Sequence, residues 1–240
     1  MSSGWKQQGY LLGMIGLLAF GGLLYGRGRE EETHAADAAA GAVEDGSIEE
    51  ETSEQEAKKI ALTFDDGPHP VYTEQMLEVL EEADVPATFF LLGQNIEGRE
   101  ELVREIAEKG HLIGNHTFHH VQITGLSKEQ ACQEIEETSD LIEELTGKGT
   151  EYVRPPFGTW NEGLESNLNL IPVMWTIDTL DWTTQNVDTI VEHVVKNAED
   201  NDIILMHDSY KSTVQAVERI IELLKAEGFE FVTVDEVLFD

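Results

Sequence analysis

The sequence from residue 58 to residue 240 predicts one α/β domain, a parallel barrel of seven strands with helices between them. Short runs of β-branched and aromatic residues alternate here with longer amphipathic runs. The short runs are almost continuously apolar, which is typical of strands that helices cover. Clusters of polar residues follow these runs, at the place where parallel α/β barrels carry their chemistry. These three observations together predict the fold class.

The predicted elements alternate along the chain as repeated strand and helix units would. The strands are expected at 59–65, 87–93, 111–116, 151–157, 171–178, 202–208 and 229–234. The clearest helices are expected at 71–83, 100–109, 128–145, 187–198 and 213–227. In the last helix, apolar residues recur at helical spacing and form one face, at Val214, Val217, Ile220, Ile221 and Leu224.

Residues 1–26 are predicted to be a signal peptide or a transmembrane anchor. An uncharged apolar run extends from Tyr10 to Gly26, with basic residues on both sides. At about 1.5 Å per residue, this run is slightly short for a hydrocarbon core of about 30 Å. Small residues at 35–42 offer a cleavage site, but charged residues separate them from the apolar run, which disfavours cleavage. We therefore favour an uncleaved anchor.

Residues 27–57 are predicted to be a disordered acidic linker, because they contain almost no large apolar side chains. The whole chain is acidic, with 48 Asp and Glu against 15 Lys and Arg and a net charge of -33. We interpret this charge as a solvated acidic surface, and it makes nucleic acid an unsuitable partner. Cys132 is the only cysteine, so no internal disulfide can form, and its place in a predicted helix indicates an inert thiol.

The first polar cluster, Thr63–Pro68, lies at the end of the predicted strand 59–65. Neighbouring side chains at a strand end point in different directions. One of Asp65 and Asp66 can therefore bind a cation while the other stays free as a base. An acidic turn closed by Gly-Pro would give the same pattern.

The second cluster, Asn115–His120, places three histidines within five residues at the end of another predicted strand. Neutral imidazole is a good zinc ligand, and two histidines with one carboxylate leave a coordination position open, as in catalytic zinc sites. The spacing allows His116 to pair with either His119 or His120.

Polar residues also end three further strands. The run 202–208 ends in His207 and Asp208, and another strand is closed by Asp178 and Asp181–Trp182. A carboxylate beside a histidine holds the ring in one tautomer and keeps it basic, which suits a general acid. The segment Arg154–Gly158 adds a cation and a rigid turn whose backbone amides can face an oxyanion.

These clusters resemble the motifs of the NodB-homology polysaccharide deacetylases, carbohydrate esterase family 4. Five motifs occur in the family's order over residues 58–240: TFDDG at Thr63, H-T-x-x-H at His116, R-x-P-F at Arg154, D-x-x-D-W at Asp178, and an apolar-x-H ending at Leu205 and His207. Five ordered motifs at strand ends are far more specific than any one of them. The resemblance implies the family's irregular (β/α)7 barrel.

The resemblance also implies a metal site and a base. By it, Asp66, His116 and His120 look like the ligands of one divalent ion, with His119 as a neighbour. Zn²⁺ suits this set best, and Co²⁺ or another first-row ion could replace it. Asp65 looks like the catalytic base, and Arg154 looks like the cation that holds it ionised and oriented.

The same resemblance implies the acid and the substrate contacts. His207 looks like the group that protonates the leaving amine, with Asp181 tuning its pKa. The backbone amide of Phe157 would stabilise the oxyanion. Trp182 and Leu205 would line an apolar pocket for the acetyl methyl group.

One departure from the family pattern lies between Gly158 and Ile171. Only a short segment is available there, where the family usually places a longer helix. We expect the barrel to be more open on that side, which could reshape the groove without affecting the motif residues.

The sequence thus predicts a metal-dependent hydrolase that removes N-acetyl groups from an N-acetylated polysaccharide such as peptidoglycan or a chitin-like polymer. An extracytoplasmic, membrane-anchored domain is expected, or a secreted one if the N-terminal segment is cleaved. The same machinery would serve an O-acetyl esterase of the acetylxylan type. A non-catalytic sugar-binding module is the remaining alternative, and the complete set of motif residues argues against it.

Overall fold

The computed structural model of the protein describes residues 57–160, 163–164 and 168–239. The predicted anchor and all but the last residue of the predicted linker lie outside these ranges. No helix within the described ranges is both long enough and apolar enough to cross a bilayer.

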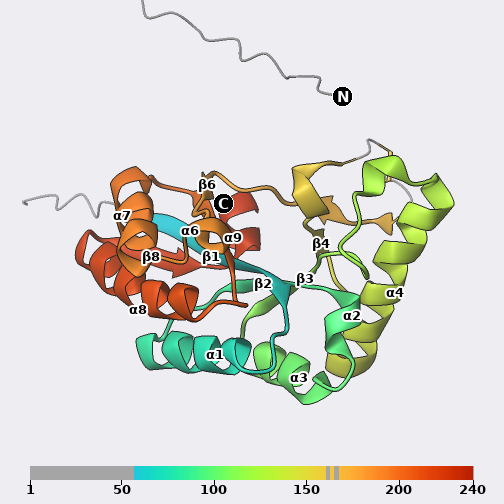
Figure 1. Ribbon diagram of the computed structural model, residues 1–240, viewed down its shortest axis with the longest axis horizontal. Coiled ribbons are helices and arrows are strands. Elements are labelled where there is room, and N and C mark those ends of the chain that lie inside the picture. The colour runs from blue at the N-terminus through green and yellow to red at the C-terminus, as the bar shows by residue number, and fades with distance from the viewer. Residues whose placement is uncertain (1–56, 161–162, 165–167, 240) are drawn as a thin grey trace, which may run out of the picture. The chain divides into compact units, whose positions relative to one another are not determined.

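A parallel sheet of eight strands forms the centre of the domain (Figure 1). The strands are β1 (Lys58–Gly67), β2 (Thr88–Leu91), β3 (Leu112–Asn115), β4 (Tyr152–Val153), β5 (Ile171–Pro172), β6 (Ile177–Asp178), β7 (Asp202–His207) and β8 (Phe229–Val232). Seven of them lie in the order β5-β4-β3-β2-β1-β7-β6, while β8 pairs with the first residues of β1. The predicted parallel α/β architecture is confirmed.

The sheet is a curled half-barrel, and its strand count differs from the seven predicted. The predicted strand 171–178 is split into β5, which pairs with β4, and β6, which pairs with β7. The backbone between them is diverted because the carbonyls of Val173 and Met174 accept hydrogen bonds from the Arg154 side chain. Among the described strands, β5 and β6 stand at the two ends of the seven-strand order and do not pair with each other.

All five predicted helices are present, with ends within two residues of those expected. The helices are α1 (Tyr72–Ala83), α2 (Gly93–Ile96), α3 (Glu100–Glu108), α4 (Lys128–Thr146), α6 (Asp181–Thr184), α7 (Val187–Asn197), α8 (Lys211–Ala226) and α9 (Val234–Phe239), with 3-10 turns η1 (Ile123–Gly125) and η2 (Pro156–Gly158). Helix α4 begins where it does because Ser127 and Gln130 form a capping box. It ends before Gly147, which has a φ of 71°.

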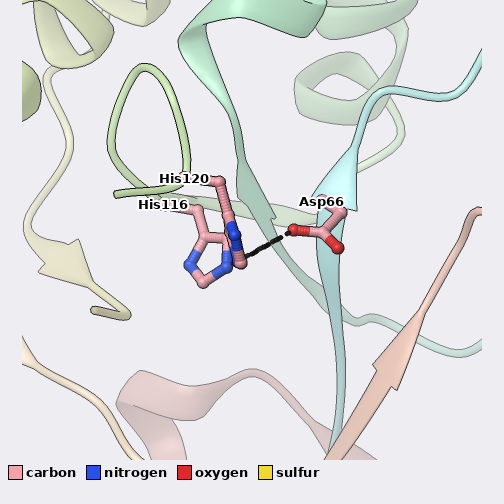
Figure 2. A group of neighbouring side chains, drawn as sticks. All are labelled: Asp66, His116 and His120. Atoms are coloured by element: carbon pink, nitrogen blue, oxygen red, sulfur yellow. Dashed lines mark ion pairs between the residues drawn. The ribbon is translucent and has the colours of Figure 1, made fainter. Parts of the chain in front are cut away.

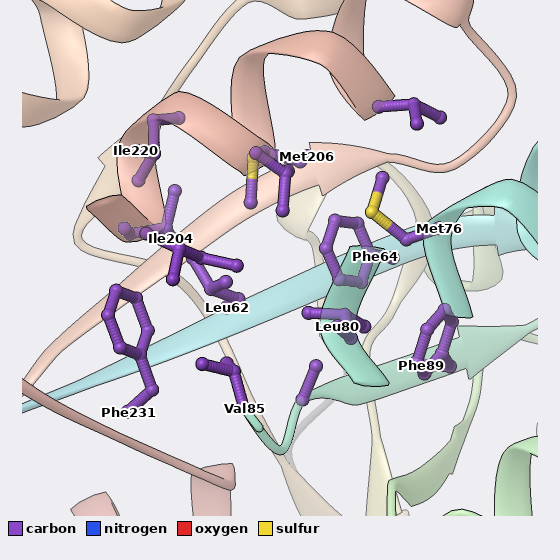
Figure 3. Packing of buried hydrophobic residues seen from close by; sticks show 14 of the residues in the cluster. Leu62, Phe64, Met76, Leu80, Val85, Phe89, Ile204, Met206, Ile220 and Phe231 are labelled. Carbon is purple, nitrogen blue, oxygen red and sulfur yellow. The ribbon is translucent and has the colours of Figure 1, made fainter. Parts of the chain in front are cut away.

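The main core lies between the sheet and helices α1, α3, α7 and α8, and Figure 3 shows part of it. Leu62 and Phe64 of β1 and Ile204 of β7 meet Leu80 of α1 and Ile220 of α8, and all five side chains are fully buried. Burial of a side chain of this size contributes about 1.5–3 kcal/mol. This layer anchors the central strands on which the polar residues stand.

The opposite face of β1 points into the curl of the sheet. Because side chains alternate along a strand, Ala61, Thr63 and Asp65 share this face. Ala61 packs there with Phe90 and Val234 in a second apolar cluster. Thr63 and Asp65 continue the same face toward the carboxyl end of β1, which places Asp65 inside the half-barrel.

Candidate active site

A β-bulge at the end of β1 brings two neighbouring carboxylates to one place. The pairing of β1 with β2 shifts between Asp65 and Gly67, so Asp66 is an extra residue, with a φ of 72°. A non-glycine residue in this left-handed region costs about 1–2 kcal/mol. Nε2 of His116 lies 3.7 Å from Asp65 Oδ2 and 3.5 Å from Asp66 Oδ1. Simple alternation predicts that the two carboxylates diverge, and the bulge corrects that expectation.

The loop after β3 carries two histidines toward Asp66 (Figure 2). Nε2 of His116 and Nε2 of His120 each lie 3.5 Å from Asp66 Oδ1. The ligand atoms of the three residues all lie within 4.8 Å of one another. Nδ1 of His116 lies 2.6 Å from the carbonyl oxygen of Arg154 and donates to it, which leaves the lone pair of Nε2 facing the carboxylate.

The donor set fits a divalent cation. Oδ1 of Asp66 is buried and has no hydrogen-bond partner among the described groups. A buried carboxylate oxygen without a partner is unfavourable, and a cation between the three side chains would satisfy it. Burial lowers the pKa of His120, although the charge of Asp66 opposes the change, and the ring is therefore neutral and able to bind a metal at neutral pH.

His119 is directed away from this cluster. Its side chain is 55% exposed, and its Nδ1 lies 2.9 Å from Oε1 of Glu134 on α4. Of the two partners that the sequence spacing allows for His116, the structure brings His120 to Asp66 and leaves His119 outside.

Arg154 is fully buried behind Asp65. Its Nη1 donates to Asp65 Oδ1 at 2.9 Å and to the hydroxyl of Thr63 at 2.6 Å. The guanidinium also lies 4.2 Å from the centre of the Phe90 ring. Because several groups hold the guanidinium, it fixes Oδ1 of Asp65 and leaves Oδ2 directed toward His116.

Asp181, which is fully buried, and His207, which is partly exposed, form a second pair of a carboxylate and a histidine. Oδ1 of Asp181 accepts from His207 Nδ1 at 2.8 Å and from Trp182 N at 2.8 Å. Oδ2 accepts from His207 N at 2.8 Å and from the Thr213 hydroxyl at 2.7 Å. Burial alone would lower the pKa of His207, but the hydrogen bond and charge of Asp181, with smaller contributions from Asp65 and Asp66, raise it to about 9. His207 is therefore protonated at neutral pH.

These groups surround one cavity of about 340 Å³. It is lined by Asp65, Asp66, His116, His120, Pro155, Phe157, Trp175, Asp178, Trp182, Leu205, His207 and Tyr210. Every predicted site residue lines it except Arg154 and Asp181, which lie buried beside it and hold two of its members. Trp175 and Tyr210 escaped the sequence reasoning, although each stands three residues from a motif residue, and an aromatic at that spacing is the signal that could have found them.

Asp208, next to His207, is a fully buried carboxyl group. The Thr73 hydroxyl of α1 donates to its Oδ2, while Oδ1 has no hydrogen-bond partner among the described groups. A Cβ at Gly67 would lie 2.8 Å from this Oδ2, so the bulge approaches Asp208 closely and requires glycine there. Burial raises the pKa of Asp208 to about 7, although the hydrogen bond from Thr73 opposes this change.

The polysaccharide deacetylase family matches residues 52–173, just over half of the chain. Together with the relatives below, this match shows that the chain belongs to the polysaccharide deacetylase family, the NodB-homology domains of carbohydrate esterase family 4.

Two bacterial relatives and one solved structure are similar to the chain. The peptidoglycan-N-acetylmuramic acid deacetylase PdaC of Bacillus subtilis (strain 168) is 38% identical over 188 residues, which cover 78% of this chain and 40% of PdaC. The peptidoglycan-N-acetylglucosamine deacetylase PgdA of Listeria monocytogenes serotype 1/2a (strain 10403S) is 37% identical over 180 residues, 75% of this chain and 39% of PgdA. The chain therefore spans about two fifths of the length of these relatives. A solved structure of Bacillus subtilis PdaC has a TM-score of 0.74 and 38% identity, and the match covers 76% of this chain and 91% of that one.

Proposed function

We propose that this chain is a metal-dependent deacetylase that hydrolyses N-acetyl groups of a polysaccharide. The observation that carries the proposal is the content of one cavity of about 340 Å³. Three residues able to bind a metal, Asp66, His116 and His120, stand there beside a candidate base, Asp65, and a candidate acid, His207. This combination suits hydrolysis of an amide, which needs an activated water and a protonated leaving nitrogen.

Asp66, His116 and His120 would hold the metal ion. Two imidazoles and a carboxylate suit Zn²⁺, and Co²⁺ or another first-row ion can use the same donors. When bound, such an ion polarises the amide carbonyl and lowers the pKa of water.

Asp65 acts as the general base in this proposal. Its Oδ2 accepts a proton from the attacking water while Arg154 holds Oδ1, and the water oxygen bonds to the carbonyl carbon. The backbone amide of Phe157 donates to the oxyanion that forms. Trp182 and Leu205 line the cavity and would hold the acetyl methyl group.

His207 acts as the general acid. It donates a proton to the amide nitrogen as the carbon–nitrogen bond breaks, and the products are acetate and a free amine on the sugar. Asp181 supports this role because its negative charge favours the protonated ring, and its hydrogen bond to Nδ1 leaves Nε2 as the nitrogen that can donate to the substrate.

The proposed substrate is peptidoglycan or a chitin-like polymer. The names of both bacterial relatives describe deacetylation of peptidoglycan, and this supports a polymer of the cell envelope. We further propose that residues 1–26 anchor the domain on the outer side of the membrane. Protease added to intact cells should then release the domain. If the domain were digested only after the cells are lysed, the assigned topology would be wrong and the domain would lie on the inner side of the membrane.

Acetate release tests the proposed reaction. The purified 240-residue chain is incubated with peptidoglycan, N-acetylated chitin oligomers and acetylxylan, with and without EDTA. We expect acetate release from an N-acetylated polymer. EDTA should abolish this release, and added Zn²⁺ should restore it. Release from acetylxylan alone would indicate an O-acetyl esterase, and no release from any polymer would favour a sugar-binding module.

A further inference from the structure

The loop that presents the two histidines adopts an unfavourable backbone conformation. Thr117 has a φ of 68° and His120 a φ of 56°, although neither is glycine. A β-branched residue such as Thr117 rarely adopts positive φ. Such residues persist only where the surrounding structure holds them in place.

Helix α4 holds this loop at two points, and each point is the residue directly before a histidine. Nδ2 of Asn115 donates to the carbonyl of Ile135 at 2.7 Å and to Oγ of Ser139 at 2.9 Å. Four residues further along the chain, the backbone N–H and the ring Nδ1 of His119 bind Glu134. The backbone N–H of His119 donates to Oε2 and its Nδ1 donates to Oε1, each at 2.9 Å.

The two histidines differ in how firmly their own surroundings hold them. The His116 side chain is 4% exposed, and its ring is fixed by the carbonyl of Arg154. The His120 side chain is 32% exposed and meets Phe157 through a ring contact with 4.9 Å between centroids. His120 therefore depends more on its backbone for its direction toward Asp66.

His119 directly precedes His120, and Glu134 accepts one hydrogen bond from its backbone N–H and one from its ring. Upstream, the Thr117 and Phe118 carbonyls accept from the backbone of α2, from Gly93 N at 3.0 Å and Gln94 N at 3.1 Å. These contacts with α2 hold Thr117 and Phe118, and Glu134 on helix α4 holds the next residue, His119.

We propose that Glu134 is a positioning residue for the metal site, which it serves by clamping His119 so that His120 faces Asp66. This inference rests on the metal site of the proposed function. Groups that orient metal ligands from outside the ligand set typically change metal affinity by about 10- to 100-fold when removed. Glu134 is well placed to act this way because its carboxylate accepts from the backbone as well as from a side chain.

Metal affinity of the full chain tests the proposal. Co²⁺ and Zn²⁺ affinities are measured by competition with a chelator for the wild type, Glu134→Ala, Glu134→Gln, His119→Ala and the matched control Glu137→Ala. Glu137 is exposed on the same helix and binds Gln133, not the loop. Thermal unfolding of each metal-free variant is followed in parallel.

Glu134→Ala should weaken metal binding by about 10- to 100-fold. Glu134→Gln should lose less, because its remaining oxygen can still accept from His119 N. His119→Ala should also lose less, because its backbone N–H still reaches Oε2, and adding it to Glu134→Ala should cost nothing more. Glu137→Ala should match the wild type within about twofold, which separates clamping from the loss of one negative charge.

Several results would overturn the inference. Wild-type metal affinity in Glu134→Ala would show that the contact between Glu134 and His119 is dispensable. If Glu134→Ala does not fold, wild-type affinity in both single variants, Glu134→Gln and His119→Ala, would show the same. Equal losses in Glu134→Ala and Glu137→Ala would assign the effect to charge. If only the melting temperature fell, Glu134 would be structural. A wild type that binds neither ion would refute the proposed metal site itself, and this inference with it.

Discussion

Nη1 of Arg154 lies 2.9 Å from Oδ1 of Asp65, with both side chains buried. One oxygen of the carboxylate is thereby committed to the cation, while the other faces His116 at 3.7 Å. The pair thus orients the carboxylate that we propose as the base, and this orientation separates its role from that of Asp66.

Asp65→Asn should reduce the rate of acetate release by about 10²- to 10⁴-fold, because the amide keeps the shape of the side chain but cannot accept a proton. Its carbonyl oxygen can still accept from Arg154, so the metal site should stay intact. Rates and metal content are measured on the same preparation. Full activity, or loss of the metal, would show that Asp65 is not the base.

Asp66→Ala should lose metal and activity together, because it removes the only charged member of the proposed ligand set. Metal content after dialysis against a weak chelator provides the measurement. His207→Ala serves as a comparison, since it should lose activity while it retains the ion. A metal content in Asp66→Ala equal to that of the wild type would contradict the assigned ligand set.

Asp181→Asn should move the basic limb of the pH–rate profile to lower pH. His207 must be protonated to act as an acid, so activity should fall as pH rises through its pKa, which the surrounding carboxylates raise to about 9 in the metal-free site. A bound divalent ion would lower this pKa, so the limb of the loaded protein should lie at or below about pH 9. A neutral residue at position 181 removes the closest negative charge.

The profile of kcat/KM is the measurement, with Asp188→Asn, an exposed change on α7, as the control. An unmoved limb in Asp181→Asn would exclude His207 as the titrating acid.

Asp208→Asn should flatten the pH dependence of stability. Burial raises the pKa of Asp208 from 3.8 to about 7, so the unfolded chain releases this proton first and the free energy of unfolding falls as pH rises from about 4 to 7. Between pH 5 and pH 8 this loss corresponds to roughly 2–3 kcal/mol. Urea unfolding of both metal-free proteins at these two pH values gives the comparison. A difference between variant and wild type that is the same at both pH values would mean that Asp208 does not titrate in this range.

The positions of the site residues could be predicted from the sequence because each motif ends a local apolar run, and local runs determine strands and their ends. The direction of the Asp66 side chain could not be predicted in this way. It depends on the bulge, which arises where β1 pairs with β2, and Asp66 is not a glycine that would have signalled positive φ. Similarly, 171–178 reads as one strand because its apolar pattern is continuous. Its division depends on Arg154, a residue distant in sequence whose side chain binds the intervening carbonyls.

Two aromatic residues that line the cavity, Trp175 and Tyr210, were not predicted as site residues from the sequence. Trp175 and Tyr210 each stand three residues from a motif residue, but this spacing alone does not place their side chains in the cavity. Trp175 precedes β6 and Tyr210 follows β7, and both line the cavity in a structure where these two strands pair, which is a tertiary property. The spacing of the histidines alone leaves His119 and His120 open, and the family resemblance selects His120; in the structure His120 lies beside Asp66 and His119 binds Glu134.

Arg154 binds two residues of the proposed mechanism. Its guanidinium donates to the proposed base, Asp65, and its backbone carbonyl accepts from the proposed metal ligand His116. It follows a strand, β4, of only two residues, and its own N–H donates to the carbonyl of Asn115 at 2.8 Å. Detachment of this short strand would release the base and a proposed metal ligand in the same event. Heat should therefore inactivate the protein in one concerted step, with no accumulation of a species that has kept its metal but lost its activity.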